Sequence, residues 1–352
     1  MAISDSADAP ARGILAFKVL WYAAMKDIAH QEQLVKGLIL ANSLFVVYGE
    51  SNSGKTFFAL DMALTIAAGQ PWRGLRTRRG LVIYIAGEGA TSVRARVLAF
   101  RIAHPELATG LPFAIVRGAV DFRSADSVAM LIATIQAAES ESGEKAALVV
   151  VDTLARAMPG GDENSTQDMG EVVANADRIR GETGAAVGFI HHAGKDPSKG
   201  ARGSSALRAA TDTEILIEGL SGPRTATVSK QRDLEGGQRM AFELVPVGIG
   251  TDPADGTVIT SCVVRHVEGT SASAPKAREL RGKAQRQFVA GMRSRAEAEP
   301  ERIYALDDLR RIARDMGMEK GTARSVVDAI TTTPYMQTCA FGYRFTDGRV
   351  EG

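Results

Sequence analysis

The sequence predicts an α/β fold with a mainly parallel β-sheet, followed by a small C-terminal domain of a different kind. Two observations predict the sheet: short apolar runs alternate with helical stretches, and these runs are apolar at nearly every position. A third observation separates the small domain, because the segment GTSASAPKA, residues 269–277, has the composition of a linker.

Composition narrows the class of protein. Of the 352 residues, 45% are hydrophobic and 24% charged, as in ordinary globular proteins. The net charge of +1 means that any contact with nucleic acid must come from a local basic patch. The two cysteines, Cys262 and Cys339, are too few for a disulfide framework or a four-cysteine zinc site. With no membrane-length apolar run and no signal-peptide pattern, we expect a cytoplasmic protein.

The first 30 residues are expected to form a tail and one helix. Residues 1–13 are small and polar, which is typical of a disordered tail. Residues 14–28 have the pattern of a helix with an apolar side. That side could contact its own domain or a neighbouring subunit, and the sequence leaves both open.

The larger domain is expected at residues 31–268. Strands that are apolar at every position are covered by helices on both faces, and ligands then bind at the carboxyl ends of the strands. Two later runs, residues 225–230 and 241–247, resemble an antiparallel pair around the turn DLEGGQ. The six apolar runs lie at residues 44–48, 81–86, 113–116, 147–151, 186–190 and 213–217.

Residues 269–295 are expected to form the linker and a basic helix, and residues 296–352 a winged-helix-like domain. Two helices, at residues 306–316 and 321–331, precede a run that resembles a hairpin turning near residues 341–342. The order of helix, helix and hairpin suggests a winged helix-turn-helix.

The charge of this domain leaves its partner open. From Lys276 to Gly352 there are 15 lysines and arginines against 11 acidic residues. Lys320 and Arg324 lie near the start of the second helix and Arg344 lies in the hairpin, where a winged helix contacts DNA. A winged helix that binds another protein, and not DNA, fits this modest excess of positive charge equally well.

A phosphate-binding motif lies between the first apolar run and the helix after it. GESNSGKT, Gly49 to Thr56, matches G-x-x-x-x-G-K-[ST] in the expected strand–loop–helix context. Its glycines let backbone amides face phosphates, Lys55 adds a positive charge and the Thr56 hydroxyl can bind Mg²⁺. The residues expected to contact the nucleotide are Gly49, Glu50, Ser51, Asn52, Ser53, Gly54, Lys55, Thr56 and Phe57.

Two carboxylates follow other strands at the same edge of the expected sheet. Asp152 ends the run ALVVVD and is expected to hold Mg²⁺ together with Thr56. Glu88, in YIAGEG, is placed to take a proton from the water that attacks the γ-phosphate. These residues predict hydrolysis of a nucleoside triphosphate.

Two further segments complete a pattern that resembles the RecA-like P-loop ATPases of the plasmid RepA type. The segments are FIHHAGKDPSKGARGSSALRAATDTEI, from Phe189, and SKQRD, from Ser229. Those ATPases are ring-forming replicative helicases, with phage relatives described only as AAA-family ATPases. The resemblance covers about residues 31–247.

The resemblance implies roles for residues on both sides of a subunit boundary. Glu88 matches the catalytic glutamate, and His192 matches a sensor of the γ-phosphate. Lys230 and Arg232 match catalytic basic residues that reach the nucleotide of the adjacent subunit in an assembled ring. The implied cofactors are ATP and Mg²⁺, and the implied assembly is a homo-oligomer, expected to be a hexamer.

Two long polar loops are expected to line the centre of such a ring, where single-stranded DNA would thread. Residues 155–170 and 194–208 are rich in glycine and contain no aromatic residue. Contact with the DNA backbone, little sequence preference and strong salt dependence are therefore expected. The residues expected to bind DNA are Lys195, Lys199, Arg202 and Arg208.

Three functions fit these features. The first is an ATP-dependent ring-forming DNA helicase or translocase that acts on single-stranded DNA in replication. The second is a DNA-dependent ATPase that loads or remodels replication or recombination proteins. The third is a nucleotide-gated DNA-binding regulator, against which Glu88 argues because a pure switch needs no catalytic base.

Overall fold

The structure is a computed structural model. It describes residues 31–87, 89–107, 110–118, 120–194, 202–267, 282–299, 302–331, 335–339 and 342–345. The expected N-terminal tail and helix and the expected linker at residues 269–277 lie outside the described residues.

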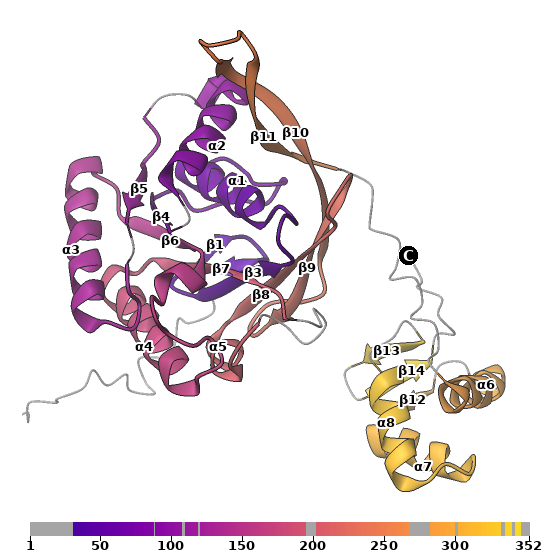
Figure 1. The fold of residues 1–352 in the computed structure, drawn as a ribbon. Helices are drawn as coiled ribbons and strands as arrows, with labels where there is room; N and C mark the ends of the chain where they lie inside the picture. Colours follow the sequence, from indigo (N-terminus) through magenta and orange to yellow (C-terminus); the bar gives the residue numbers. More distant parts are fainter. Residues whose placement is uncertain are drawn as a thin grey trace, which may run out of the picture.

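A nine-stranded sheet forms the centre of the larger domain (Figure 1). Six of its strands run parallel in the order β8-β3-β7-β6-β4-β5, and they are the six apolar runs of the sequence. The predicted α/β fold with a mainly parallel sheet is confirmed. The bounds are β3 Leu44–Gly49, β4 Leu81–Ala86, β5 Phe113–Arg117, β6 Ala146–Asp152, β7 Ala186–His192 and β8 Thr213–Glu218.

Three antiparallel strands extend this sheet beyond β8. β9, Arg224–Gln231, and β10, Arg239–Thr251, form the antiparallel pair that the sequence predicts. β11, Val258–His266, adds an edge strand that the sequence analysis did not identify. In β11 only Val264 is buried, so the strand lacks the continuous apolar run that marks the others.

Helices cover both faces of the sheet (Figure 1). One core joins the sheet to α1 and α2, and a second core joins the opposite face to α3, α4 and α5. Alternate side chains of each strand enter the two cores, which explains why the runs are apolar at nearly every position. The bounds are α1 Lys55–Ala68, α2 Ala90–Ala103, α3 Ala125–Ser142, α4 Thr166–Thr183 and α5 Ser205–Ala210.

The ends of α3 and α4 follow from local sequence. Ser124 and Ser165 precede these helices, and each side-chain oxygen accepts a hydrogen bond from a backbone N–H of the first turn. Gly143 and Gly184 follow them in the left-handed conformation that ends many helices. The remaining short elements are β1 Gln33–Val35, β2 Ile39–Leu40 and the 3-10 turns Pro105–Leu107 and Leu154–Ala157.

The C-terminal unit has the order helix, strand, two helices and hairpin, which is the order of a winged helix. Its three strands form an antiparallel sheet in the order β12-β14-β13. The elements are α6 Lys283–Ala298, β12 Ile303–Tyr304, α7 Leu306–Asp315, α8 Lys320–Ile330, β13 Met336–Cys339 and β14 Gly342–Phe345.

One boundary differs from the expectation. We placed the start of this unit at residue 296, after a basic helix, but that position falls inside α6. Phe288, Val289 and Met292 of α6 are buried in the core of the unit with Leu309 and Val327. The unit therefore begins with α6. The apolar residues of this helix are few and lie among basic ones, so the sequence pattern did not indicate a buried helix. Among the described residues, no helix has both the length and the apolar character needed to cross a bilayer.

Candidate active site

Five residues connect the end of β3 to the start of α1, and they form a loop suited to bind an anion. Gly54, immediately before α1, has φ +94°, and Asn52 has φ +64°. Such left-handed residues within a turn direct successive backbone N–H groups toward one concave side. Since α1 begins here, the partial positive charge of its N-terminus adds to the site.

Two buried side chains, one in this loop and one at the start of α1, carry polar groups that suit a phosphate. The Lys55 ammonium donates to the Glu50 carbonyl at 2.7 Å and thus lies over the loop. The Ser53 hydroxyl is buried and has no hydrogen-bond partner among the described residues. An unsatisfied buried polar group costs about 1–3 kcal/mol, and a phosphate oxygen would supply the missing partner. The residues present therefore fit a bound triphosphate.

Thr56 and Asp152 come together from positions far apart in the sequence. The Thr56 hydroxyl, at the start of α1, lies 3.4 Å from Oδ1 of Asp152, which ends β6. Asp152 is buried, and its Oδ2 accepts a hydrogen bond of 2.7 Å from Tyr84. Hydroxyl and carboxylate oxygens are the ligands that Mg²⁺ takes beside nucleotide phosphates. Among the described residues there is no cluster of three or more histidine, cysteine, aspartate or glutamate side chains that could hold a metal ion.

The expected catalytic glutamate lies outside the described residues. Glu88 follows β4, whose last residue, Ala86, is paired in register with Asp152. The Gly87 amide donates to the Asp152 carbonyl at 2.7 Å, which places the start of this segment beside the end of β6. The segment that leads to Glu88 thus lies at the carboxyl ends of the strands, on the same side as the phosphate loop. The catalytic role of Glu88 stays a prediction.

The two histidines at the end of β7 have different surroundings. His192 is partly exposed and is paired in register with Gly49, the first residue of the phosphate loop. His191 is fully buried, and its Nε2 contacts the Arg202 carbonyl at 2.7 Å. Burial lowers the pKa of His191. The geometry therefore separates a structural His191 from His192, which is the one beside the nucleotide loop.

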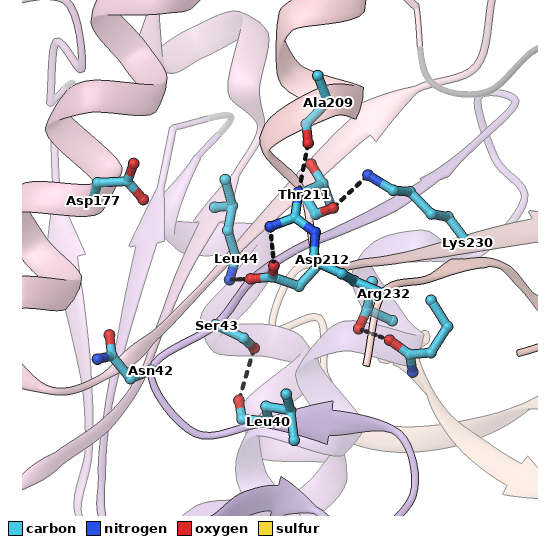
Figure 2. A network of polar contacts seen from close by, with 12 residues as sticks. Leu40, Asn42, Ser43, Leu44, Asp177, Ala209, Thr211, Asp212, Lys230 and Arg232 are labelled. Atoms are coloured by element: carbon cyan, nitrogen blue, oxygen red, sulfur yellow. Dashed lines mark hydrogen bonds and ion pairs between the residues drawn. The ribbon is translucent and has the colours of Figure 1, made fainter. Parts of the chain in front are cut away.

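Lys230 and Arg232 lie near the start of β8, at the end of the parallel strands opposite to the phosphate loop. Figure 2 shows both cations beside Ala209, Thr211 and Asp212. Arg232 donates to Oδ1 of Asp212 at 2.9 Å and to the Ala209 carbonyl at 2.7 Å. Lys230 donates to the carbonyls of Arg208 and Thr211. Both cations thus bind the last turn of α5 and the two residues between α5 and β8, where carbonyls lack helical partners. Burial lowers the pKa of Lys230.

The two long polar loops lie together. The Ser204 amide donates to the Glu163 carbonyl at 2.7 Å, and the Arg202 guanidinium lies 3.4 Å from the Glu163 carboxylate. Arg208 faces the buried carboxylate of Glu214 at 3.6 Å. The other two cations expected to bind DNA, Lys195 and Lys199, lie outside the described residues.

Three residues that the sequence analysis did not single out contact these groups. Tyr84 binds Asp152, and Asp212 binds Arg232. Arg224, at the start of β9, lies against Gly54, where an added Cβ would come within 3.1 Å of its Cδ. The only feature of the sequence that could have indicated a role for Tyr84 is its hydroxyl, which lies within the apolar run LVIYIA. No local pattern marks Asp212 or Arg224, because β-sheet pairing brings them to their partners.

Comparison with known proteins identifies the larger domain. A family model described as AAA domain matches residues 11–198. One solved ATPase domain is similar at 13% identity and TM-score 0.44, over 58% of this chain and 82% of that one. The RadB recombinase is similar at 20% identity and TM-score 0.43, over 58% and 88%. No curated protein matches the sequence.

Proposed function

We infer the function from the premise that the chain belongs to the AAA domain family and carries a RecA-like P-loop ATPase domain. We propose that the protein is a ring-forming, ATP-driven helicase or translocase of the plasmid RepA type, which acts on single-stranded DNA in replication. The observation that carries the proposal is the position of Arg232, which lies at the amino ends of the parallel strands, whereas the phosphate loop of the same chain lies at their carboxyl ends.

In this proposal, ATP is hydrolysed by residues of the phosphate loop and of the strand ends beside it. Lys55 would bind the β- and γ-phosphates, and Thr56 and Asp152 would hold Mg²⁺. The positive charge of the ion would stabilise the negative charge on the phosphoryl oxygens. Glu88 orients and deprotonates the attacking water, and His192 senses the γ-phosphate. The geometry that supports this assignment is the 3.4 Å approach of the Thr56 and Asp152 oxygens beside a loop with an unsatisfied Ser53.

Ring formation is inferred from distance within one chain. The Asp212 carboxylate, which holds Arg232, accepts a hydrogen bond from the Leu44 amide at the first residue of β3. Gly49 and its phosphate loop are at the last residue of the same strand, about 16 Å away at ~3.3 Å per residue. Arg232 therefore does not reach its own nucleotide. We propose that it reaches the nucleotide of an adjacent subunit, where its charge stabilises the transition state.

The proposed DNA contact uses the loops after β6 and β7. The carboxyl ends of these parallel strands lie at the same edge of the sheet, and contacts between Glu163 and the segment Arg202–Ser204 join the two loops. Arg202, which lies in this contact, is 59% exposed, whereas Arg208 is 46% exposed and lies on α5, facing Glu214 near the start of β8. Cations without aromatic neighbours favour binding to the phosphate backbone, which weakens as salt is raised.

Strand displacement on a forked duplex with ATP tests this function. We expect unwinding by the full chain, none by Lys55→Ala, and none with a non-hydrolysable analogue. Hydrolysis that single-stranded DNA stimulates without any strand displacement would instead favour an ATPase that loads or remodels other proteins. Protection of one duplex sequence in footprinting would favour the nucleotide-gated regulator. Hydrolysis that does not respond to DNA would contradict the proposal.

A further inference from the structure

Tyr84 brings the only hydroxyl of β4 to the edge of the metal site from within the apolar core. The side chain is fully buried, and its ring lies 6.1 Å from that of Phe113 on the neighbouring strand. Its hydroxyl donates to Oδ2 of Asp152 at 2.7 Å. A short bond between a hydroxyl and an ionised carboxylate in a buried setting is among the stronger hydrogen bonds of proteins.

The two oxygens of Asp152 face different partners. Oδ2 accepts from Tyr84, while Oδ1 lies 3.4 Å from the Thr56 hydroxyl at the start of α1. β4 and β6 are adjacent parallel strands in the middle of the sheet, so the backbones that carry Tyr84 and Asp152 are fixed relative to each other. The bond to Tyr84 thus holds Oδ2 on the side of β4 while Oδ1 faces Thr56.

We propose that Tyr84 is a positioning residue for the metal site, one that holds Asp152 so that Oδ1 faces Mg²⁺. The inference rests on the proposed ATP site and adds a residue that acts through Asp152 rather than on the nucleotide. Partners behind a metal ligand fix its orientation, and their loss lowers metal affinity about 10- to 100-fold. The competing explanation is that Asp152 merely satisfies the buried Tyr84 hydroxyl, in which case removing the hydroxyl affects stability and not the metal.

Tyr48 provides a matched control for Tyr84→Phe. It is also a buried tyrosine in a central strand, and its hydroxyl contacts Ser229 at 3.0 Å, away from Asp152. Tyr48→Phe and Tyr84→Phe thus each remove one buried hydroxyl. We expect similar losses of thermal stability, but only Tyr84→Phe should alter metal binding.

Metal affinity is measured without turnover, by electron paramagnetic resonance of Mn²⁺ added to the full chain with a non-hydrolysable ATP analogue. We expect Tyr84→Phe to weaken Mn²⁺ about 10- to 100-fold relative to Tyr48→Phe. Binding of the analogue in excess EDTA should be unchanged. Equal Mn²⁺ affinities in the two variants would overturn the proposal. Failure of the unmodified chain to bind the analogue at all would refute the ATP site itself, which is a different outcome.

A second measurement avoids substitution in case Tyr84→Phe does not fold. The chain contains six tyrosines, which can be labelled with ¹³C at the ring carbon that bears the hydroxyl. We expect the Tyr84 resonance to shift when Mg²⁺ is added to the analogue complex, and that of Tyr48 to stay fixed. A Tyr84 resonance that does not respond to Mg²⁺ would contradict a link between its hydroxyl and the metal.

Discussion

Arg232 is bound to Asp212 of its own chain, with 2.9 Å between a guanidinium nitrogen and Oδ1 of the carboxylate (Figure 2). The second oxygen of Asp212 accepts from the Leu44 amide at 2.9 Å, so the pair is anchored to the first residue of β3. The Arg232 side chain is nevertheless 48% exposed. A cation that is oriented by a carboxylate and open to solvent is suited to contact a neighbouring molecule.

Arg232→Ala should leave nucleotide binding intact and lower hydrolysis, because the side chain is far from its own loop. Loss of an arginine that acts across an interface costs about 10³-fold or more in kcat. Fluorescent-nucleotide titration and steady-state hydrolysis measure the two effects. Arg265→Ala, which removes an exposed arginine of β11 that is paired with Glu243 of β10, is the matched control and should change neither nucleotide binding nor hydrolysis.

Mixing experiments decide whether the arginine acts in trans. Subunits with Arg232→Ala and subunits with Glu88→Gln are each expected to be inactive. In mixed rings some interfaces combine an intact loop and Glu88 from one subunit with an intact Arg232 from the next. Partial recovery of hydrolysis is therefore expected, and its absence at every mixing ratio would remove the support for a shared site.

Lys55→Ala should abolish nearly all ATP hydrolysis. The Lys55 ammonium lies over the phosphate loop, on the Glu50 carbonyl, and no other described lysine of the loop could replace its charge. Lys36→Ala, which changes an exposed lysine next to the β1–β2 turn, should retain full hydrolysis. Both variants are compared by phosphate release at saturating ATP. Unchanged turnover in Lys55→Ala would refute the assignment of the phosphate site.

The parts of the site that lie in one stretch of sequence could be predicted, and those made by tertiary contact could not. The loop from Gly49 to Thr56 carries its function in consecutive residues, and Asp152 ends a run whose apolar character marks a buried strand. Tyr84 lies 68 residues from Asp152 in the chain, and only the pairing of β4 with β6 joins them. The sequence also does not show that Arg232 is held by Asp212, since a β-bulge between β8 and β9 shifts their register.

Strand β11 and helix α6 are the two parts of the fold that the sequence pattern did not predict correctly. β11 buries one side chain, so its hydrophobic pattern is too weak to predict a strand. In α6 three buried residues lie among many charged ones, and the helix was expected to precede the small domain rather than to belong to it. Continuous apolar runs predict strands reliably here because both faces of the parallel sheet are covered.

A chain that ends at Val267 should fold and hydrolyse ATP. The two cores around the large sheet contain residues between Leu34 and Val264, whereas the core of the C-terminal unit contains residues from Phe288 to Phe345. Each unit thus buries its own apolar surface, as independent domains do. Cooperative thermal unfolding and ATP turnover measure the result. A shortened chain that aggregates or loses turnover would contradict the independence of the two cores.

His191 should make the stability of the larger domain depend on pH. Burial lowers the pKa of His191, and the hydrogen bond to the Arg202 carbonyl and the nearby Glu163 oppose this only in part. Below about pH 6.5 the unfolded chain therefore binds a proton at this position more readily than the folded chain, so stability falls as pH falls. The loss from this one group between about pH 7.5 and 5.5 is at most about 1.4 kcal/mol. Urea unfolding should show a smaller pH dependence in His191→Gln than in the unmodified chain. Equal pH dependence in the variant and the unmodified chain would mean that His191 takes up a proton as readily in the folded protein as in the unfolded one.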